Sequence, residues 1–410
     1  MKTDPFITHY LSFYGLRLLK LSNFAPKEPD LRLIYAALSQ KELVRINAYI
    51  QKELTKFHEG VIDPLSGQVP VSRRRFSKND IIKKQFIEDV PDDLHNSLHD
   101  DDCWIRVLEV IRSGDHSLFK RVCAMVEERL VYQSKLKVNS VLQKQLDQIV
   151  LAFKLSSGEV DILILLFLIE IEHHVDNYFC SHLNLNKVGH SIRIFSRFFK
   201  MKPQDIRKFL SKDSLLVRGG IIEKKSDSIA LATHMVRFLS GLGTNDVKES
   251  FLSSKKSDME LTPAQFALPE ASVELILKLL STDIGTNILL YGKPGTGKTE
   301  FSLALGYLTK RKVFFVNAAD DSGDENLDFR KSAIIASQNL LEPEEAIIVV
   351  DECDTIINIS NGFWGCDDGK KDTKAWINKQ NIKLSGSPIE STELMNLPNV
   401  DSHTLKSSKL

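Results

Sequence analysis

Two stretches near the N-terminus repeat apolar residues every three or four positions, which is the spacing of one face of an α-helix. The first covers residues 1–60 and the second covers residues 104–155. Between them, residues 61–103 contain scattered prolines and a glycine, with basic side chains in one half and acidic side chains in the other. Prolines and glycine spaced in this way are typical of a linker or mobile loop. We therefore expect two helical regions joined by an irregular segment.

Residues 156–241 change from a purely helical pattern to a mixed one. The predicted elements, in chain order, are a helix at 192–199, a helix opened by Pro203, a turn into a strand at 215–222, a strand at 228–232 and a short helix at 236–239. This succession resembles a winged-helix module. The polar residues 242–260 that follow it predict a linker.

The winged-helix-like region is locally basic. Between Lys187 and Lys225 there are eleven Lys and Arg residues against three Asp and Glu residues. Such an excess can mark a DNA-binding face, but winged helices also bind proteins, and a basic surface can face an acidic partner. No side chain can be assigned to a base edge. Nucleic acid is therefore the less favoured partner, and it stays open.

Residues 261–380 alternate helix-patterned segments with short apolar runs, which are typical of buried strands. The predicted order is a helix at 271–280, a strand at 287–291, a helix from 300, a strand at 312–317, a helix at 325–341 and a strand at 345–354. This order indicates an open α/β sheet. The expected fold class is a mainly α N-terminal region with a winged-helix-like module, followed by an α/β domain.

A glycine-rich loop stands between the first of these strands and the helix after it. Its residues are Gly292, Lys293, Pro294, Gly295, Thr296, Gly297, Lys298 and Thr299. Their spacing is the full G-x-x-x-x-G-K-[ST] motif of P-loops. Glycines let backbone N–H groups approach a dense anion such as a triphosphate, and the N-terminus of the next helix adds a favourable dipole. We expect Lys298 to reach the outer phosphates of ATP and the Thr299 hydroxyl to bind Mg²⁺.

Two adjacent carboxylates end the last predicted strand. Asp351 and Glu352 follow the apolar run 347–350, which places them at the carboxyl edge of the sheet, where ligands bind in open α/β folds. We expect Asp351 to hold Mg²⁺ through a water molecule and Glu352 to orient and polarise the attacking water. An acidic pair after a strand is a weak signal alone, but it is a strong one about fifty residues after a P-loop lysine.

Residues 284–380 resemble the AAA+ ATPases, and most closely the AAA branch in its narrow sense. Residues 287–299 are similar to the Walker A strand and loop of that family, residues 323–326 to a short acidic motif, and residues 347–354 to its Walker B strand. The resemblance implies ATP hydrolysis with Mg²⁺, with Glu352 at the hydrolytic position. It also implies self-association into a ring that remodels a protein substrate.

The pattern stops after residue 380. Residues 381–410 are polar and without period, and they predict a disordered tail. A family member continues with a sensor 1 strand, arginine fingers and a helical lid, and we find no counterpart of these. An arginine finger is worth about 10³–10⁵ in rate, so we expect an incomplete P-loop NTPase domain, truncated or frameshifted after Walker B. Two alternatives to an ATPase stay open: a non-catalytic nucleotide-binding or interaction protein, and a DNA-binding protein that acts through the winged-helix-like module.

Composition argues against several other classes of protein. The formal net charge is zero, so no overall field directs the chain to nucleic acid or to a membrane surface. The five cysteines are scattered, with no CxxC pair and no zinc spacing, which fits reduced thiols. The longest apolar run, at 162–169, is too short to cross a bilayer. We therefore expect a cytoplasmic protein without membrane contact.

Overall fold

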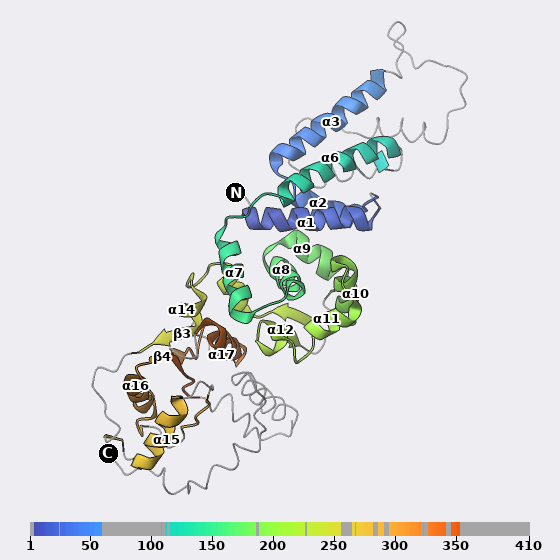
Figure 1. Ribbon diagram of the computed structural model, residues 1–410. Coiled ribbons are helices and arrows are strands. Elements are labelled where there is room, and N and C mark those ends of the chain that lie inside the picture. The colour runs from blue at the N-terminus through green and yellow to red at the C-terminus, as the bar shows by residue number, and fades with distance from the viewer. Residues whose placement is uncertain are drawn as a thin grey trace. The chain divides into compact units, whose positions relative to one another are not determined.

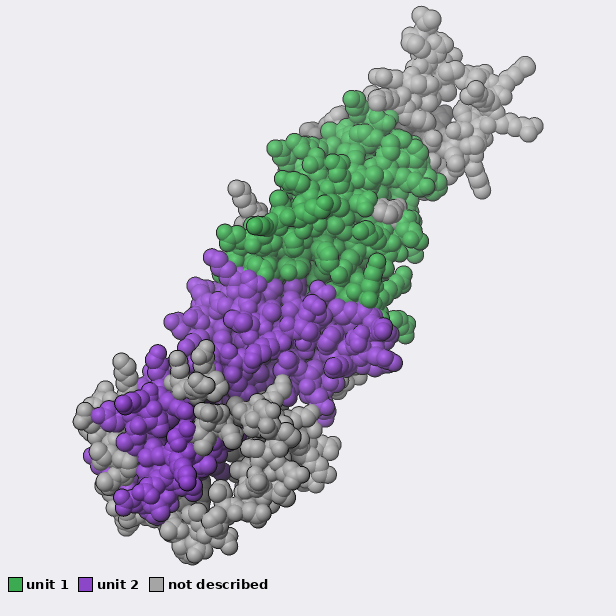
Figure 2. Space-filling model, in the orientation of Figure 1, with its two compact units in different colours: residues 1–143, 165–200 green, residues 144–164, 201–410 purple. Residues whose placement is uncertain are grey.

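The structure is a computed structural model of the chain. It describes residues 4–23, 25–59, 108, 111–112, 115–185, 188–225, 228–255, 265–266, 268–281, 286–290, 295–320, 323, 327–341 and 346–352. The chain divides into two compact units, shown in different colours in Figure 2: unit 1 is residues 1–143 with 165–200, and unit 2 is residues 144–164 with 201–410. The predicted linker at 61–103 and the predicted tail at 381–410 lie outside the described residues.

Unit 1 is helical throughout the part of it that the structure describes (Figure 1). Its elements are α1 (Pro5–Leu21), α2 (Glu28–Ala36), α3 (Gln40–Glu59), α6 (His116–Ser134), α9 (His173–Asp176), the π-helix η2 (Asn177–His182) and α10 (Val188–Phe199). Two boundaries between the units fall within α7 (Val141–Phe153) and α8 (Ser157–Ile171), and a third follows α10, after residue 200. The two helical regions predicted at 1–60 and 104–155 are thus present wherever the structure describes them.

Helix α1 packs against both α2 and α6. It begins at Pro5, whose fixed backbone suits the first helical turn. Oδ1 of Asp4 accepts a hydrogen bond of 2.7 Å from the Phe6 N–H, which satisfies one of the free donors at this end. A Cβ on Gly15 would lie only 3.0 Å from Leu130 on α6. The absence of a side chain at this position therefore permits the close approach of α1 and α6.

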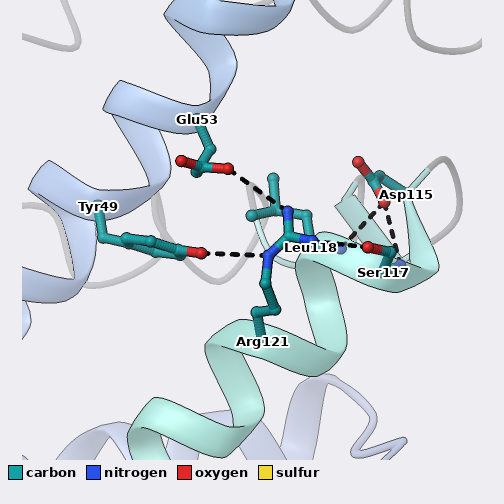
Figure 3. Close-up of polar contacts among 6 residues, drawn as sticks. All are labelled: Tyr49, Glu53, Asp115, Ser117, Leu118 and Arg121. Atoms are coloured by element: carbon teal, nitrogen blue, oxygen red, sulfur yellow. Dashed lines mark hydrogen bonds and ion pairs between the residues drawn. The ribbon is translucent and has the colours of Figure 1, made fainter.

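A polar cluster around Arg121 joins α3 to α6 (Figure 3). Arg121 donates to Tyr49 Oη at 3.1 Å and to Ser117 Oγ at 2.7 Å, and its Nη2 lies 3.5 Å from Glu53 Oε2. Asp115 caps α6 by accepting from the Ser117 N–H at 3.0 Å. Solvent-exposed ion pairs contribute only about 0–1 kcal/mol each, so this cluster orients the two helices more than it stabilises them.

Unit 2 contains helices and two small sheets (Figure 1). Its remaining elements are α11 (Pro203–Phe209), α12 (Leu215–Arg218), β1 (Ile222–Lys225), β2 (Ser228–Leu231), α13 (Thr233–Leu239), α14 (Val247–Phe251), β3 (Leu252–Ser254), α15 (Glu270–Leu280), α16 (Lys298–Thr309), β4 (Lys312–Val316), α17 (Leu327–Leu340) and β5 (Ala346–Val349). Within the described ranges of the chain, no helix is both long and apolar enough to cross a bilayer.

The larger sheet has the strand order β3-β4-β5. β4 and β5 are parallel, with Val313 opposite Ile347 and Phe315 opposite Val349. These four side chains cluster with Leu303 of α16, so α16 covers one face of the sheet. α17 also packs on β4. This helix-covered parallel pair is the α/β arrangement that the alternating pattern predicts.

The predicted linker at 242–260 is wrong for the residues of α14 and β3, which form a helix and a strand. Asp246 starts α14, because its side chain accepts from the Lys248 N–H at 2.8 Å. Phe251 is buried, and its ring centroid lies 5.5 Å from that of Phe329 on α17. β3 then pairs antiparallel with β4. A segment that is polar in sequence therefore completes the edge of the sheet.

Two further predictions differ from the structure. Residues 215–218 form the short helix α12 instead of a turn into a strand, because Ser214 Oγ accepts from the Val217 N–H at 3.2 Å and caps it. The predicted strand at 287–291 is not part of the sheet in its described portion, residues 287–290. β5 has β4 as its partner in the described sheet.

From α11 to α13 the order is helix, the short helix α12, two strands and a short helix, and the first strand is Ile222–Lys225 instead of the predicted 215–222. β1 and β2 form an antiparallel hairpin, with Ile222 opposite Leu231. The first helix of the predicted module, α10, belongs instead to unit 1. There the ring of Phe198 packs edge-on against Tyr14 and Phe179, at centroid distances of 5.2 and 5.0 Å. The segment 156–241 is therefore divided between the two units.

Candidate functional site

The loop before α16 has the backbone that its glycines predict. Gly295 and Gly297 both have φ near +78°, in the left-handed region that glycine enters without the steric cost of a Cβ. Among the residues that the structure describes, a Cβ at Gly295 would meet no other atom within 4 Å. Residues 292–294, the first part of the predicted phosphate loop, lie outside the described residues.

Helix α16 starts at Lys298, directly after this loop. The first backbone N–H groups of a helix have no partner within it, and the helix dipole makes this end favourable for an anion. Lys298 is half-buried here, and its Nζ lies 3.5 Å from Thr296 Oγ1. The predicted lysine is therefore at the helix end, beside the loop.

The end of β5 brings two carboxylates to the same region. β5 ends at Val349, and Asp351 and Glu352 follow it. Thr299 Oγ1, in the first turn of α16, donates a hydrogen bond of 2.9 Å to Asp351 Oδ2. These residues are 52 positions apart in the chain. The structure thus brings the glycine-rich loop and the acidic pair together.

The chain turns sharply just after Asp351. Its Oδ1 accepts a hydrogen bond of 3.0 Å from the backbone N–H of Glu352. Glu352 has φ near +47°, a left-handed conformation that costs a residue with a Cβ about 1–3 kcal/mol. The Glu352 side chain is exposed. Asp351 is therefore tied into the turn, whereas the carboxylate of Glu352 reaches solvent.

Arg330 also belongs to this site, although the motifs do not indicate it. It lies on α17, is only 5% exposed, and donates from Nη1 to the Glu352 carbonyl oxygen at 3.0 Å and from Nη2 to the Asp351 carbonyl oxygen. The pattern of α17 holds a signal for it, since Arg330 shares a helix face with the buried Ala333 and Ser337. A charged side chain on a buried face needs polar partners.

The oxygen atoms of Thr299 and Asp351 fit Mg²⁺, a hard cation that prefers oxygen ligands. Because they lie 2.9 Å apart, one Mg²⁺ bound to the Thr299 hydroxyl would be close enough to Asp351 to be held by that carboxylate through a water molecule. Among the residues that the structure describes, no group of three or more His, Cys, Asp or Glu side chains forms a metal site by itself. A cation at Thr299 and Asp351 would therefore complete its shell with phosphate oxygens or water.

Comparison with protein families agrees with this geometry. Residues 288–378 match the family model of the ATPase family associated with various cellular activities (AAA). The chain carries an AAA+ ATPase-like domain. The matched residues of this AAA+ domain include Lys298, Thr299, Arg330, Asp351 and Glu352. No curated protein and no solved structure matches the chain.

Proposed function

We propose that this chain binds ATP with Mg²⁺ in its AAA+ domain and hydrolyses it to ADP and phosphate. The observation that carries the proposal is the 2.9 Å contact between Thr299 Oγ1 and Asp351 Oδ2. In P-loop ATPases the loop hydroxyl and the Walker B carboxylate act on the same Mg²⁺. A direct contact between these two oxygens supports a single shared metal position.

The glycine-rich loop is the proposed phosphate site. Its backbone N–H groups and the N-terminus of α16 would bind the phosphate oxygens, since Gly295 and Gly297 add no Cβ at two positions of the loop and adopt the positive φ that turns it. Lys298 would neutralise charge on the outer phosphates. Its position at the start of α16, next to Thr299, supports this role.

Glu352 is the proposed hydrolytic residue. Water attacks the γ-phosphorus, the bond from this phosphorus to the bridging oxygen of ADP breaks, and the proton of the water passes toward a base. Glu352 would orient and polarise that water, because its carboxylate is exposed next to Asp351 and carries no ion pair among the described contacts. Bound Mg²⁺ would stabilise the charge that develops on the phosphate oxygens.

Remodelling of a protein substrate by a self-associated ring is the wider function we propose, on the basis of the AAA+ domain. The helices and hairpin from α11 to α13 would then serve as an adaptor. A contact that supports this coupling runs from α17 to the loop after α12: Ser332 Oγ donates to the Gly219 carbonyl oxygen. The same helix carries Arg330 at the Walker B turn.

A titration with a fluorescent ATP analogue tests binding. We expect saturable binding by the full chain, and a loss of about tenfold or more in Lys298→Ala, because the phosphate charge loses its closest cation. Lys278→Ala is the matched control, since Lys278 is exposed on α15 and its replacement favours helix. Equal affinity of all three proteins would refute the phosphate site.

Phosphate release by the same proteins tests hydrolysis. We expect turnover by the wild type that Glu352→Gln abolishes without weakening nucleotide binding, and that Glu274→Gln on the exposed face of α15 leaves unchanged. Turnover that survives Glu352→Gln would refute the role of Glu352. Binding without any phosphate release would refute hydrolysis and leave a non-catalytic nucleotide-binding protein.

A further inference from the structure

We propose that Arg330 is a positioning residue, which holds the Asp351–Glu352 turn in the shape that metal and water require. The inference rests on the proposed nucleotide site for its functional consequence. Its structural part, that one guanidinium fixes this turn, stands on the contacts alone. Arg330 binds the carbonyl oxygens of Asp351 and Glu352, so it acts on the site through the backbone of the turn.

The turn needs a donor from outside the sheet. The ladder between β4 and β5 reaches Val349, which lies opposite Phe315. The carbonyl groups of Asp351 and Glu352 come after this last pair and are bound by the two terminal nitrogens of Arg330. Two nearly parallel N–H groups on a rigid fork can hold two successive carbonyl groups at once, which a lysine ammonium cannot do in the same way.

The conformation of Glu352 gives this contact its importance. Its φ of about +47° is one that residues other than glycine rarely adopt. The conformation is held on one side by the Glu352 N–H, which donates to Asp351 Oδ1 at 3.0 Å. On the other side it is held by Arg330, which binds the carbonyl oxygen of Glu352 itself. Without the guanidinium, the turn is free to relax toward an ordinary backbone conformation.

Arg330 is itself anchored by a fixed helix. Two residues further along α17, Ser332 is fully buried, donates to the Gly219 carbonyl oxygen and lies 3.0 Å from His234 Nε2. The ring of the buried Phe329 packs edge-on against His234, with centroids 5.4 Å apart. The start of α17 is therefore held against its neighbours within unit 2, and the guanidinium has a rigid base.

The inference predicts a selective defect. Loss of Arg330 would release Asp351, and with it the oxygen that faces Thr299, whereas the glycine-rich loop and Lys298 would keep their places. Nucleotide binding without metal should therefore survive, and only its enhancement by Mg²⁺ and the hydrolytic step should fall. Removal of a group that orients a metal ligand typically costs about 10- to 100-fold in metal affinity or activity.

Hydrogen exchange tests the structural part without any nucleotide. In the full chain, we expect amide exchange in peptides covering 346–352 to accelerate about tenfold or more in Arg330→Met and by a smaller factor in Arg330→Lys. The control is Lys331→Met, which removes the neighbouring cation and its 3.0 Å ion pair with Asp328. Exchange that is unchanged in both Arg330 variants, or equally fast in the Lys331 variant, would overturn the proposal. If Arg330→Met does not fold, Arg330→Lys decides.

Binding of the fluorescent ATP analogue with and without Mg²⁺ tests the functional part. Without metal, we expect the affinity of Arg330→Lys and Arg330→Met for the analogue to stay within about twofold of that of the wild type. The factor by which Mg²⁺ raises this affinity should be about 10- to 100-fold smaller in both variants than in the wild type. Equal losses with and without metal would contradict a positioning role. If the wild type binds no nucleotide, the proposed function fails, and hydrogen exchange still decides whether Arg330 holds the turn.

Discussion

Thr299 Oγ1 donates a 2.9 Å hydrogen bond to Asp351 Oδ2, and this contact joins the first turn of α16 to the end of β5. Each residue belongs to a motif that binds the same ligand in P-loop ATPases. Their contact is therefore more informative than either motif alone. It places a hydroxyl and a carboxylate at one point beside a left-handed glycine loop.

The hydroxyl of Thr299, not its methyl group, should determine metal binding. We expect Thr299→Ser to keep the Mg²⁺ dependence of ATP affinity within about twofold, and Thr299→Ala to lose about tenfold or more of it, since only alanine removes the oxygen ligand. A Mg²⁺ titration at fixed ATP analogue measures this. Equal behaviour of the serine and alanine variants would argue against a metal ligand at this position.

Replacement of Glu352 by glycine should separate stability from activity. Glycine removes the cost of a left-handed conformation, about 1–2 kcal/mol, but adds chain entropy of about 0.5–1 kcal/mol to the unfolded state. We expect the unfolding free energy of Glu352→Gly to stay equal or rise by up to about 1 kcal/mol, while phosphate release is lost. Urea unfolding measures the first and a phosphate assay the second.

The comparison variant for this prediction is Glu274→Gly, in the interior of α15. There glycine brings no relief of strain and should destabilise by about 1 kcal/mol. Similar losses of stability in the two glycine variants would contradict a left-handed backbone at Glu352.

Gly220 and Gly295 should respond differently to alanine. Both have positive φ, so alanine costs about 1–2 kcal/mol at either position. A Cβ at Gly220 would in addition overlap the backbone of Asp328 at the start of α17, whereas a Cβ at Gly295 would meet no atom of the described residues within 4 Å. We expect Gly220→Ala to lower the melting temperature clearly more than Gly295→Ala. A larger effect at Gly295 would contradict the packing of α17.

Stability should fall in mild acid because of His234. Burial lowers the pKa of His234 to about 4, and the charges of Asp328 and Asp320 oppose this shift only in part. The unfolded chain therefore takes up this proton at a higher pH than the folded one. The neutral His234 ring therefore contributes fully to the unfolding free energy above its ordinary pKa of 6.5. This contribution is lost as the pH falls toward 4. Between pH 7 and pH 5 we expect a loss of about 2 kcal/mol of unfolding free energy.

A substitution isolates this contribution from those of other groups. His234→Gln removes the titrating ring and should flatten the dependence of urea stability on pH, even though it weakens the protein at every pH. His190→Gln is the control, since His190 is exposed on α10 and its replacement should leave the slope unchanged. A slope that persists in His234→Gln would assign the acid sensitivity to other groups.

Much of the candidate site could be predicted from the sequence, because it depends on neighbours along the chain. The helix expected after the glycine-rich loop is present as α16, starting at Lys298. The strands expected at 312–317 and 345–354 are present as β4 and β5, although β5 ends at Val349. Glycines determine the loop, and runs of apolar β-forming residues determine the strands. Such signals are local, and the sequence shows them directly.

Pairing between distant segments could not be predicted in the same way. β3 is only three residues long, and Ser253 pairs with Phe315, far along the chain. Its polar composition predicts a linker because a local pattern does not contain the partner strand. Arg330 binds backbone carbonyl groups of Asp351 and Glu352. Every residue has such a group, so this contact leaves no motif.

A double-mutant cycle on Thr299 and Asp351 tests the central claim most directly, because it asks whether both side chains act on one metal. The quantity to measure is the gain in affinity for ATP on addition of Mg²⁺, by calorimetry, in the wild type, Thr299→Ala, Asp351→Asn and the double variant. If the two oxygens hold the same Mg²⁺, the double variant loses little more of this gain than either single variant. Losses that multiply in the double variant, or a gain that none of the substitutions changes, would contradict a shared metal-bound nucleotide.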